Sequence, residues 1–153
     1  MNKVATAAVG VGAVVVVGYG AVALGLLGFK EDVSFNLKKD SLGVCKPSDP
    51  GPMSSGWLRK VTWTVTNVDC DPQYVSIRNF KKSLGGGSYG SAEAITKPNP
   101  VDGGPVATGG SDQLKAKIDK FVFLVATYKY EIWIGPTAGG VALGLDPDID
   151  IWP

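Results

Sequence analysis

Hydrophobic and polar positions divide the chain into two parts. From Val4 to Phe29 there are 26 residues without a charged side chain. From Glu31 onward, apolar and polar residues alternate with a period of two over short stretches, a pattern typical of half-buried β-strands. The pattern therefore predicts an apolar segment over residues 1–29 and a β-rich domain over residues 30–153.

The apolar segment is long enough to cross a membrane. About 20 apolar residues in a helix span the hydrocarbon core of a bilayer, which is ~30 Å thick. We therefore predict one uncleaved N-terminal transmembrane α-helix over residues 1–29, with the lipid bilayer as its partner. Two other interpretations stay open: a signal peptide cleaved after Ala21-Val22-Ala23, and a buried helix of a soluble protein.

Small residues recur along this segment at helical spacing. Ala8 with Gly12, and Ala21 with Gly25, form small-xxx-small pairs that let membrane helices approach closely. These four residues are candidate helix-packing positions and favour self-association into an oligomer. The general abundance of small residues in membrane helices explains the same pattern.

The remainder of the chain shows the pattern of an antiparallel β-sandwich. Short strands are separated by Gly, Pro and Asp turns, and no amphipathic helical stretch is present. Residues 120–126 are apolar on both faces, which predicts a central strand. Residues 83–110 contain eight glycines and three prolines, which predicts one long loop. The expected strands are residues 33–37, 61–66, 74–80, 111–120, 120–126, 128–134, 141–145 and 148–152.

Two stretches carry a resemblance to a known fold. Residues 61–67 (VTWTVTN), and residues 128–134 (YKYEIWI) followed by 146–151 (DPDIDI), resemble the immunoglobulin-like and cupredoxin-like sandwiches of exported proteins. The resemblance covers roughly residues 57–80 and 121–153. It implies a scaffold used for adhesion, assembly and surface display. Cupredoxins bind copper through two histidines, and this chain has none, so we expect no copper and no other cofactor.

The two cysteines bear on the compartment of the domain. In an exported sandwich, Cys45 and Cys70 would form one disulfide; two reduced thiols in a cytoplasmic domain are the alternative. Lys30, Lys38 and Lys39 follow the apolar segment, and the positive-inside rule then favours a cytoplasmic domain. We nevertheless predict a single-pass membrane protein whose domain is extracytoplasmic or on a virion surface.

Composition argues against several kinds of chemistry. Without histidine, Ser-His-Asp and Cys-His catalytic sites and the commonest metal ligand are excluded. The glutamates number only three, Glu31, Glu93 and Glu131, and no pair among them stands out. Residues 30–153 carry 14 basic and 14 acidic side chains, a balance that gives no electrostatic case for nucleic acid. We expect no enzyme, no metal site, no nucleic-acid partner and no small-molecule substrate.

These observations favour a structural role. We predict a membrane-anchored structural or assembly protein, a subunit of a cell envelope, virion or filament, that associates with itself or with a partner structural protein. The alternative is a surface binding module for a carbohydrate or peptide, in which an exposed Trp57, Trp133 or Trp152 contacts the ligand.

Overall fold

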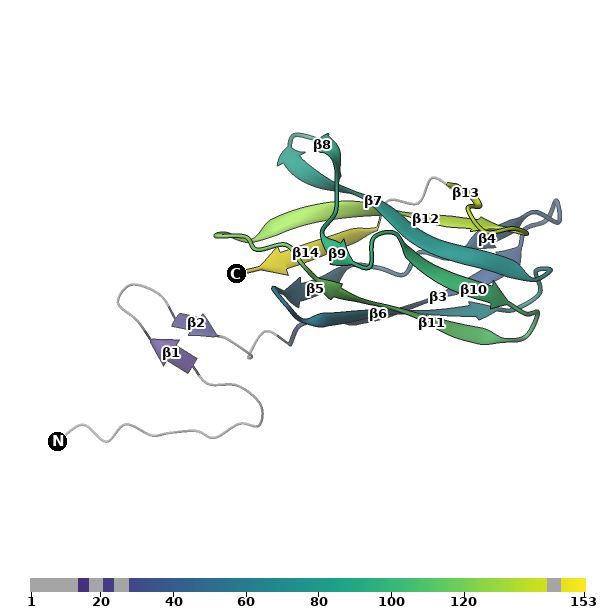
Figure 1. Ribbon diagram of the computed structural model, residues 1–153, viewed down its shortest axis with the longest axis horizontal. Coiled ribbons are helices and arrows are strands. Elements are labelled where there is room, and N and C mark those ends of the chain that lie inside the picture. The colour runs from purple at the N-terminus through teal and green to yellow at the C-terminus, as the bar shows by residue number, and fades with distance from the viewer. Residues whose placement is uncertain (1–13, 17–20, 24–27, 143–146) are drawn as a thin grey trace.

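The computed structural model describes residues 14–16, 21–23, 28–142 and 147–153 of the chain. Every regular element within these residues is a β-strand (Figure 1). The strands are β1 (Val14–Val16), β2 (Ala21–Ala23), β3 (Asp32–Lys39), β4 (Cys45–Pro47), β5 (Met53–Gly56), β6 (Lys60–Asn67), β7 (Gln73–Gly85), β8 (Ser88–Glu93), β9 (Thr96–Lys97), β10 (Val101–Val106), β11 (Ser111–Ile118), β12 (Ala126–Gly135), β13 (Val141–Ala142) and β14 (Asp148–Trp152).

Two sheets pack face to face and confirm the predicted β-sandwich. One has the strand order β4-β3-β6-β11-β9, and the other has the order β10-β7-β12-β14-β5, with β8 paired to β7 and β13 paired to β12. The prediction of purely antiparallel sheets was wrong, because β3 pairs with β6 in parallel and β14 pairs with β5 in parallel. Between β3 and β6 the chain crosses to the other sheet through β5, and such a crossover makes a parallel neighbour attainable. Alternation in the sequence reports which face a residue occupies, and it does not report the direction of the neighbouring strand.

The core lies between the sheets and follows the alternation in the sequence. On β6, Val61, Trp63 and Val65 point inward and are fully buried. Trp63 packs edge-on against Tyr130 of β12 with ring centroids 5.8 Å apart, and Phe80 of β7 lies 5.7 Å from Tyr130. Aromatic pairs in this range add to the stabilisation from buried area. One aromatic cluster therefore joins the middle strands of both sheets.

The predicted N-terminal helix falls mostly on residues outside those that the structure describes. The two described pieces of that segment, β1 and β2, are short strands paired antiparallel, with Val15 opposite Val22. No helix in the described part of the chain has the length and hydropathy needed to span a membrane. Of the predicted helix-packing residues, Ala8, Gly12 and Gly25 lie outside the described residues, and Ala21 is the first residue of β2.

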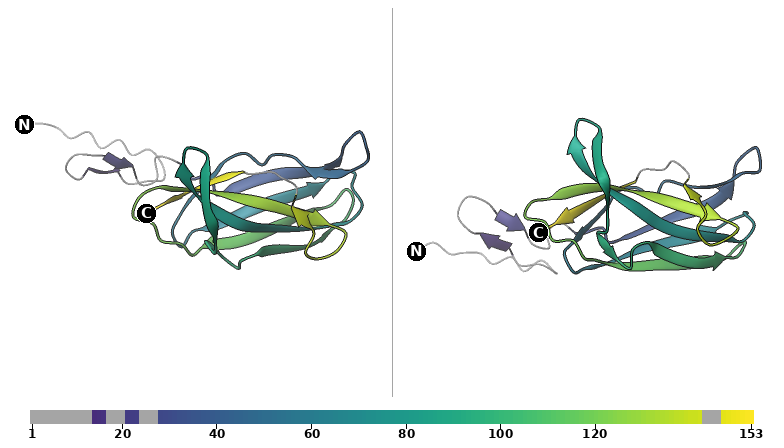
Figure 2. Two further views of the ribbon diagram at one scale, coloured as in Figure 1. Left: turned by 90° about the horizontal axis from the view of Figure 1, so that it is seen from above. Right: turned by 45° about the horizontal axis from the view of Figure 1, so that its top comes forward.

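Residues 83–110 do not form one long loop. They include the end of β7, all of β8, β9 and β10, and three buried apolar side chains, Ile95, Val101 and Val106. The glycines and prolines were misleading because β7 is 13 residues long and offers pairing partners to both β8 and β10. Pairing of this kind outweighs local propensity. The β7–β8 hairpin stands out from the sandwich in Figures 1 and 2.

Residues 120–126 were wrongly predicted to be a central strand. Residues 119–125 form the connection from β11 to β12, and within it only Val122 is buried. Phe123 and Leu124 are 87% and 81% exposed. An apolar run without alternation is typical of a strand that is buried on both faces. Here the run lies in a connection at the end of the sandwich, where no sheet covers it.

Candidate functional site

A cluster of polar and aromatic side chains lies on the outer face of the larger sheet. The Arg78 guanidinium of β7 lies 4.9 Å from the ring centre of Trp133 on β12. Arg78 Nε donates to Ser76 Oγ at 2.7 Å, and Arg78 Nη2 lies 3.2 Å from Asp102 Oδ1 on β10. Ser76 Oγ donates to the same carboxylate oxygen at 2.5 Å. The pairing of β10, β7 and β12 thus brings together side chains from three strands that are far apart in the sequence.

A backbone irregularity brings a second group to the same face. Between Lys129 and Glu131 the register of β12 against β7 shifts, so that β7 carries one extra residue. Asn79 occupies that bulge with a φ of 53°, a left-handed conformation that asparagine tolerates better than most residues. Because of the bulge, Arg78 and Asn79 are both partly exposed on the outer face, while Phe80 stays in the core.

Glu131 is the centre of this second group. Asn79 Nδ2 and Trp133 Nε1 donate to Glu131 Oε2 at 2.6 and 2.8 Å, and Lys81 Nζ lies 3.2 Å from Oε1. Burial raises the pKa of the Glu131 carboxyl, but these three donors outweigh it and hold the pKa below its usual value. A general acid needs a raised pKa, so the lowered pKa argues against that role for Glu131.

The other two glutamates are held in separate ion pairs. Glu31 pairs with Arg59, and Glu93 Oε2 lies 2.7 Å from Lys120 Nζ. Hydrogen bonding to Glu31 raises the pKa of Arg59, and hydrogen bonding to Glu93 raises the pKa of Lys120. Within the described residues, no group of three or more Asp, Glu or Cys side chains has an arrangement that could hold a metal ion.

A hollow of about 90 Å³ lies beside Arg78 and Trp133, bounded by Tyr74, Gly103 and the turn at residues 138–140. This volume would hold about three water molecules and is well below the roughly 300–1,000 Å³ of small-molecule sites. A wider, open depression of about 460 Å³ lies on the other side of Arg78, next to Asn79 and Glu93. The guanidinium of Arg78 covers one face of the Trp133 ring, so that face is not free to stack on a sugar.

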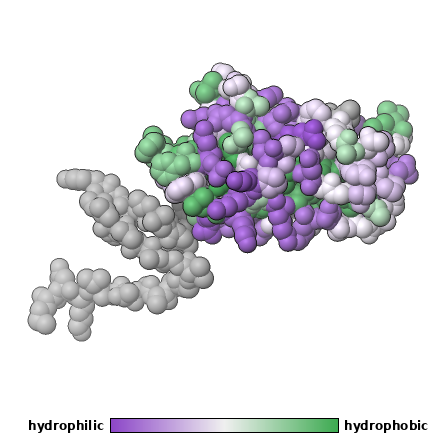
Figure 3. All heavy atoms as spheres, viewed as in Figure 1, coloured by the Kyte–Doolittle hydropathy of each residue, from purple (hydrophilic) through white to green (hydrophobic). Residues whose placement is uncertain are grey.

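A different surface lies at the end of the sandwich where the chain leads from Phe29 into β3. The turn from β5 to β6 and the connection from β11 to β12 meet there, joined by the Leu58 N–H donating to the Ile118 carbonyl at 2.9 Å. Figure 3 shows hydrophobic side chains at this end, with others at the far end and on the projecting hairpin. We call it the apolar end; among the described residues its exposed hydrophobic side chains are Trp57, Leu58, Phe121, Phe123, Leu124 and Val125.

The rings of the apolar end pack on one another. Trp57 and Phe121 meet edge-on with centroids 5.2 Å apart, and Phe121 and Phe123 do so at 5.0 Å. Trp152 at the end of β14 lies nearby in the fold, 6.4 Å from the ring of Phe29. The three tryptophans proposed as ligand contacts therefore do not form one site, since Trp133 lies on the outer sheet face.

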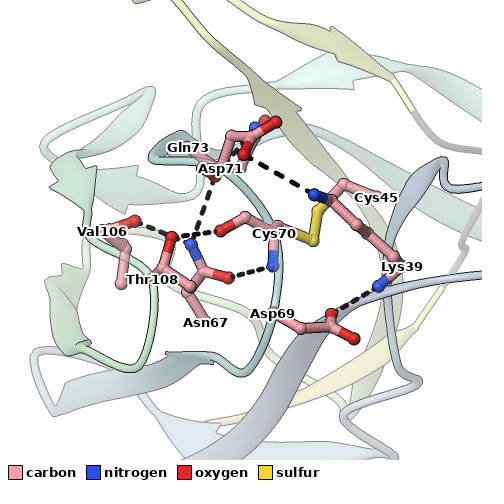
Figure 4. Close-up of polar contacts among 9 residues, drawn as sticks. All are labelled: Lys39, Cys45, Asn67, Asp69, Cys70, Asp71, Gln73, Val106 and Thr108. Carbon is pink, nitrogen blue, oxygen red and sulfur yellow. Dashed lines mark hydrogen bonds and ion pairs between the residues drawn. A yellow bond between two sulfur atoms is a disulfide. The ribbon is translucent and has the colours of Figure 1, made fainter.

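The opposite end of the sandwich is closed by covalent and polar links (Figure 4). Cys45 and Cys70 form the predicted disulfide, which joins β4 to the turn after β6. The buried Asn67 donates from Nδ2 to the Val106 carbonyl at 2.9 Å and accepts the Cys70 N–H at 2.9 Å. Thr108 Oγ1 donates to the Cys70 carbonyl at 2.6 Å. We call this the disulfide end.

The sequence pointed to Glu131, Trp133 and Trp57 as individual residues, but neither the side chains that contact them nor the apolar end was predicted. Arg78, Asn79 and Asp102 could not be placed near Glu131 without the strand pairing. A signal for the apolar end was present: residues 121–125 (FVFLV) lack alternation and follow directly after the charged Asp119 and Lys120.

The sequence matches no protein-family model and no curated protein. Among solved structures, the chain is similar to one from a complex of the chaperone CsuC with the tip adhesion subunit CsuE, from the archaic chaperone-usher Csu pili of Acinetobacter baumannii. The TM-score is 0.49 at 14% identity, over 67% of this chain and 48% of that chain. It is also similar to dithionite-reduced auracyanin from the photosynthetic bacterium Roseiflexus castenholzii, with a TM-score of 0.46 at 14% identity, over 82% of this chain and all of that one. The all-β sandwich is consistent with the immunoglobulin-like and cupredoxin-like resemblance expected from the sequence, but similarities of this size say nothing of function.

Proposed function

We propose that this chain is a membrane-anchored structural subunit. One N-terminal apolar segment holds a non-catalytic β-sandwich at a bilayer surface, where the domain assembles with copies of itself or with another structural protein of an envelope, virion or filament. The observation that carries the proposal is the uncharged run from Val4 to Phe29, which continues into β3 after only two residues.

The arrangement of the ends supports this role. Phe29 and Trp152 lie against each other, so both the start of the domain and the C-terminus are at the apolar end. The disulfide end then faces away from the membrane and is available to partners. A disulfide persists in oxidising surroundings, which favours an extracytoplasmic or virion-surface domain over the orientation that Lys30, Lys38 and Lys39 would favour.

Chemistry of the polar side chains also supports a non-catalytic domain. Each of the three glutamates is engaged by a basic side chain, and Glu131 accepts two further hydrogen bonds. The sequence offers no histidine to serve as a base.

Fractionation of cells that express the full chain tests the proposal. We expect the protein to stay in the membrane pellet after an alkaline carbonate wash and to yield cross-linked oligomers or partner adducts in mild detergent. Release by carbonate would overturn the anchor. A strict monomer that forms no adduct would overturn the structural role. Protease added to sealed vesicles gives the side of the membrane on which the domain lies.

A second candidate function is a binding module on the outer face of the larger sheet. The hollow beside Arg78 and Trp133 favours it, because a guanidinium and an indole ring line a space of about 90 Å³ that fits a small polar group. Screening the full chain on glycan and peptide arrays, with Trp133→Ala as the comparison, tests this function. Binding that disappears in Trp133→Ala while the thermal unfolding temperature is kept would support it; no binding by the parent protein would remove it.

A further inference from the structure

We propose that the apolar end is itself a membrane-contact surface, whose aromatic side chains lie in the headgroup layer of the bilayer that holds the anchor. This inference rests on the proposed anchoring and adds a second contact, made by the folded domain. Its occupant is the surface of a lipid bilayer.

The connection between the apolar segment and the domain leaves little room for any other placement. Only Lys30 and Glu31 separate Phe29 from the first residue of β3. The three peptide steps from Phe29 to Asp32 span about 10 Å at most, even when fully extended. An anchor that ends at Phe29 therefore brings this end of the sandwich to within about 10 Å of the membrane surface.

The connection is also tied down and does not serve as a free hinge. The Lys30 N–H donates to Ser54 Oγ at 2.8 Å, and the Ser54 N–H donates to the Lys30 carbonyl at 3.0 Å. The ring of Phe29 lies 6.4 Å from Trp152 and 4.9 Å from the Arg59 guanidinium. The domain thus begins at Phe29 and is oriented by contacts of that residue, so the apolar end faces the membrane.

The exposed side chains are of the kind that bilayer interfaces favour. The rings of Trp57, Phe121 and Phe123 form one row of edge-to-face contacts, and the exposed Leu124 follows Phe123 in the chain. Tryptophan is enriched at the headgroup level, and exposed contiguous apolar patches mark interaction surfaces. The row is held in place without help from the membrane, because the buried Val122 fixes the middle of the loop to the core.

Charges around the apolar end are compatible with a headgroup layer. The carboxylates of Glu31 and Glu93 are both neutralised by ion pairs with Arg59 and Lys120. Exposed lysines at the same end, Lys30 and Lys60, can extend toward lipid phosphates while their methylene stems follow the apolar surface. Asp32 and Asp119 are exposed at the same end, so the rim carries charges of both signs, as the zwitterionic headgroup layer of a phosphatidylcholine bilayer does.

The position of the anchor also decides between a bilayer and a second copy of the chain. If two copies paired through their apolar ends, each apolar segment would emerge inside the interface, where it could not reach a membrane. A bilayer covers the apolar end and receives the segment from the same side.

Tryptophan fluorescence in vesicles tests the inference with the full chain. All four tryptophans, at positions 57, 63, 133 and 152, lie in the domain and none in the apolar segment. Quenching by phosphatidylcholine brominated near the top of its acyl chains therefore reports contact of the domain with lipid. We expect quenching in the parent protein and a clear loss of quenching in Trp57→Phe.

A double variant and a matched control separate the surface from the anchor. Phe123→Asp with Leu124→Asp places charge at the apolar end, and Leu42→Asp places it on a side chain 85% exposed in the β3–β4 turn at the other end. We expect all proteins to float with the vesicles, the double variant to lose most of its quenching, and Leu42→Asp to retain it.

The outcomes distinguish the two proposals. If the parent protein does not float with vesicles, the anchoring proposal fails. If the parent protein floats but is not quenched, the membrane-contact surface is overturned while the anchor stands. The same conclusion follows if the double variant and Trp57→Phe are quenched as strongly as the parent protein. If it floats unquenched and cross-links as a dimer through the apolar end, a second copy is the occupant instead. Circular dichroism of each variant verifies that the fold is kept.

Discussion

The two ends of the sandwich are built on opposite principles. At the disulfide end, loops are joined by a covalent bond and by a buried asparagine that bonds three backbone groups, those of Cys70, Asp71 and Val106. At the apolar end, backbone hydrogen bonds such as that from Leu58 to Ile118 join the loops, and the aromatic rings that pack on one another there remain exposed. The first arrangement stabilises the fold, whereas the second leaves hydrophobic surface in water, where burial would gain about 25 cal/mol per Å². The disulfide end therefore carries links that stabilise the fold, and the apolar end carries the surface for which we propose membrane contact.

Removing the disulfide should have the largest effect on stability. The cross-link closes a loop with a sequence separation of 25 residues, and the chain-entropy relation gives about 3.5 kcal/mol for a loop of that size. We expect Cys45→Ala with Cys70→Ala to lower the free energy of unfolding by about that amount. Urea denaturation in detergent micelles measures it. Dithiothreitol should lower the stability of the parent protein and leave the double variant unchanged; an equal response in both would contradict the role of the disulfide.

Replacing Asn67 should give the next largest effect. Asn67→Ala leaves the Cys70 N–H and the Val106 carbonyl without their side-chain partner in a buried site, which costs about 2–3 kcal/mol. The exposed Asn36 on β3 provides a matched control, and Asn36→Ala should change the free energy of unfolding by less than about 0.5 kcal/mol. Equal effects of the two substitutions would show that the polar links of the disulfide end do not stabilise it.

The cluster around Glu131 lies midway between the ends and should have an intermediate effect that depends on pH. The pKa of the Glu131 carboxyl is lowered in the folded state. Its contribution to the free energy of unfolding is therefore present above the usual pKa of 4.5 and is lost as the pH falls through the folded-state pKa. At neutral pH we expect Glu131→Gln to cost about 1 kcal/mol, since it weakens charge-assisted hydrogen bonds. Denaturation curves of both proteins should converge as the pH is lowered below 4.5. If the difference in unfolding free energy between the two proteins does not change with pH, the three donors do not act through the carboxylate charge.

Alternation in the sequence was enough to predict the strands that have one buried face. Val33, Phe35 and Leu37 on β3, and Val61, Trp63 and Val65 on β6, occupy the core as their spacing indicates. Neither the parallel pairing of these two strands nor the strands within residues 83–110 could be predicted, because both depend on partners distant in the sequence.

The candidate sites were predictable only in part, for the same reason. Cys45 and Cys70 could be paired because they are the only two cysteines. Glu131 and Trp133 are two residues apart on one strand, but the Arg78 and Asn79 that complete their surroundings depend on a bulge in β7. Residues 121–125 were misassigned because hydrophobicity alone does not distinguish a side chain that meets the core from one that meets a partner outside the chain.

Substitution at the apolar end should have the smallest effect on stability. Phe123 and Leu124 are almost fully exposed, so changing both to serine removes little that is buried on folding, and the free energy of unfolding should change by less than about 0.5 kcal/mol. Val122→Ala, one residue earlier, is the matched control: its side chain is buried, and its truncation should cost about 1–2 kcal/mol. Urea denaturation in detergent measures both. A serine double variant as unstable as the one without the disulfide would mean that these side chains hold the fold together, and the division between a stabilising end and an interacting end would be wrong. If only Val122→Ala unfolds more easily, the hydrophobic side chains of Phe123 and Leu124 are dispensable for folding. They are then free to serve in contacts that the domain makes with a membrane.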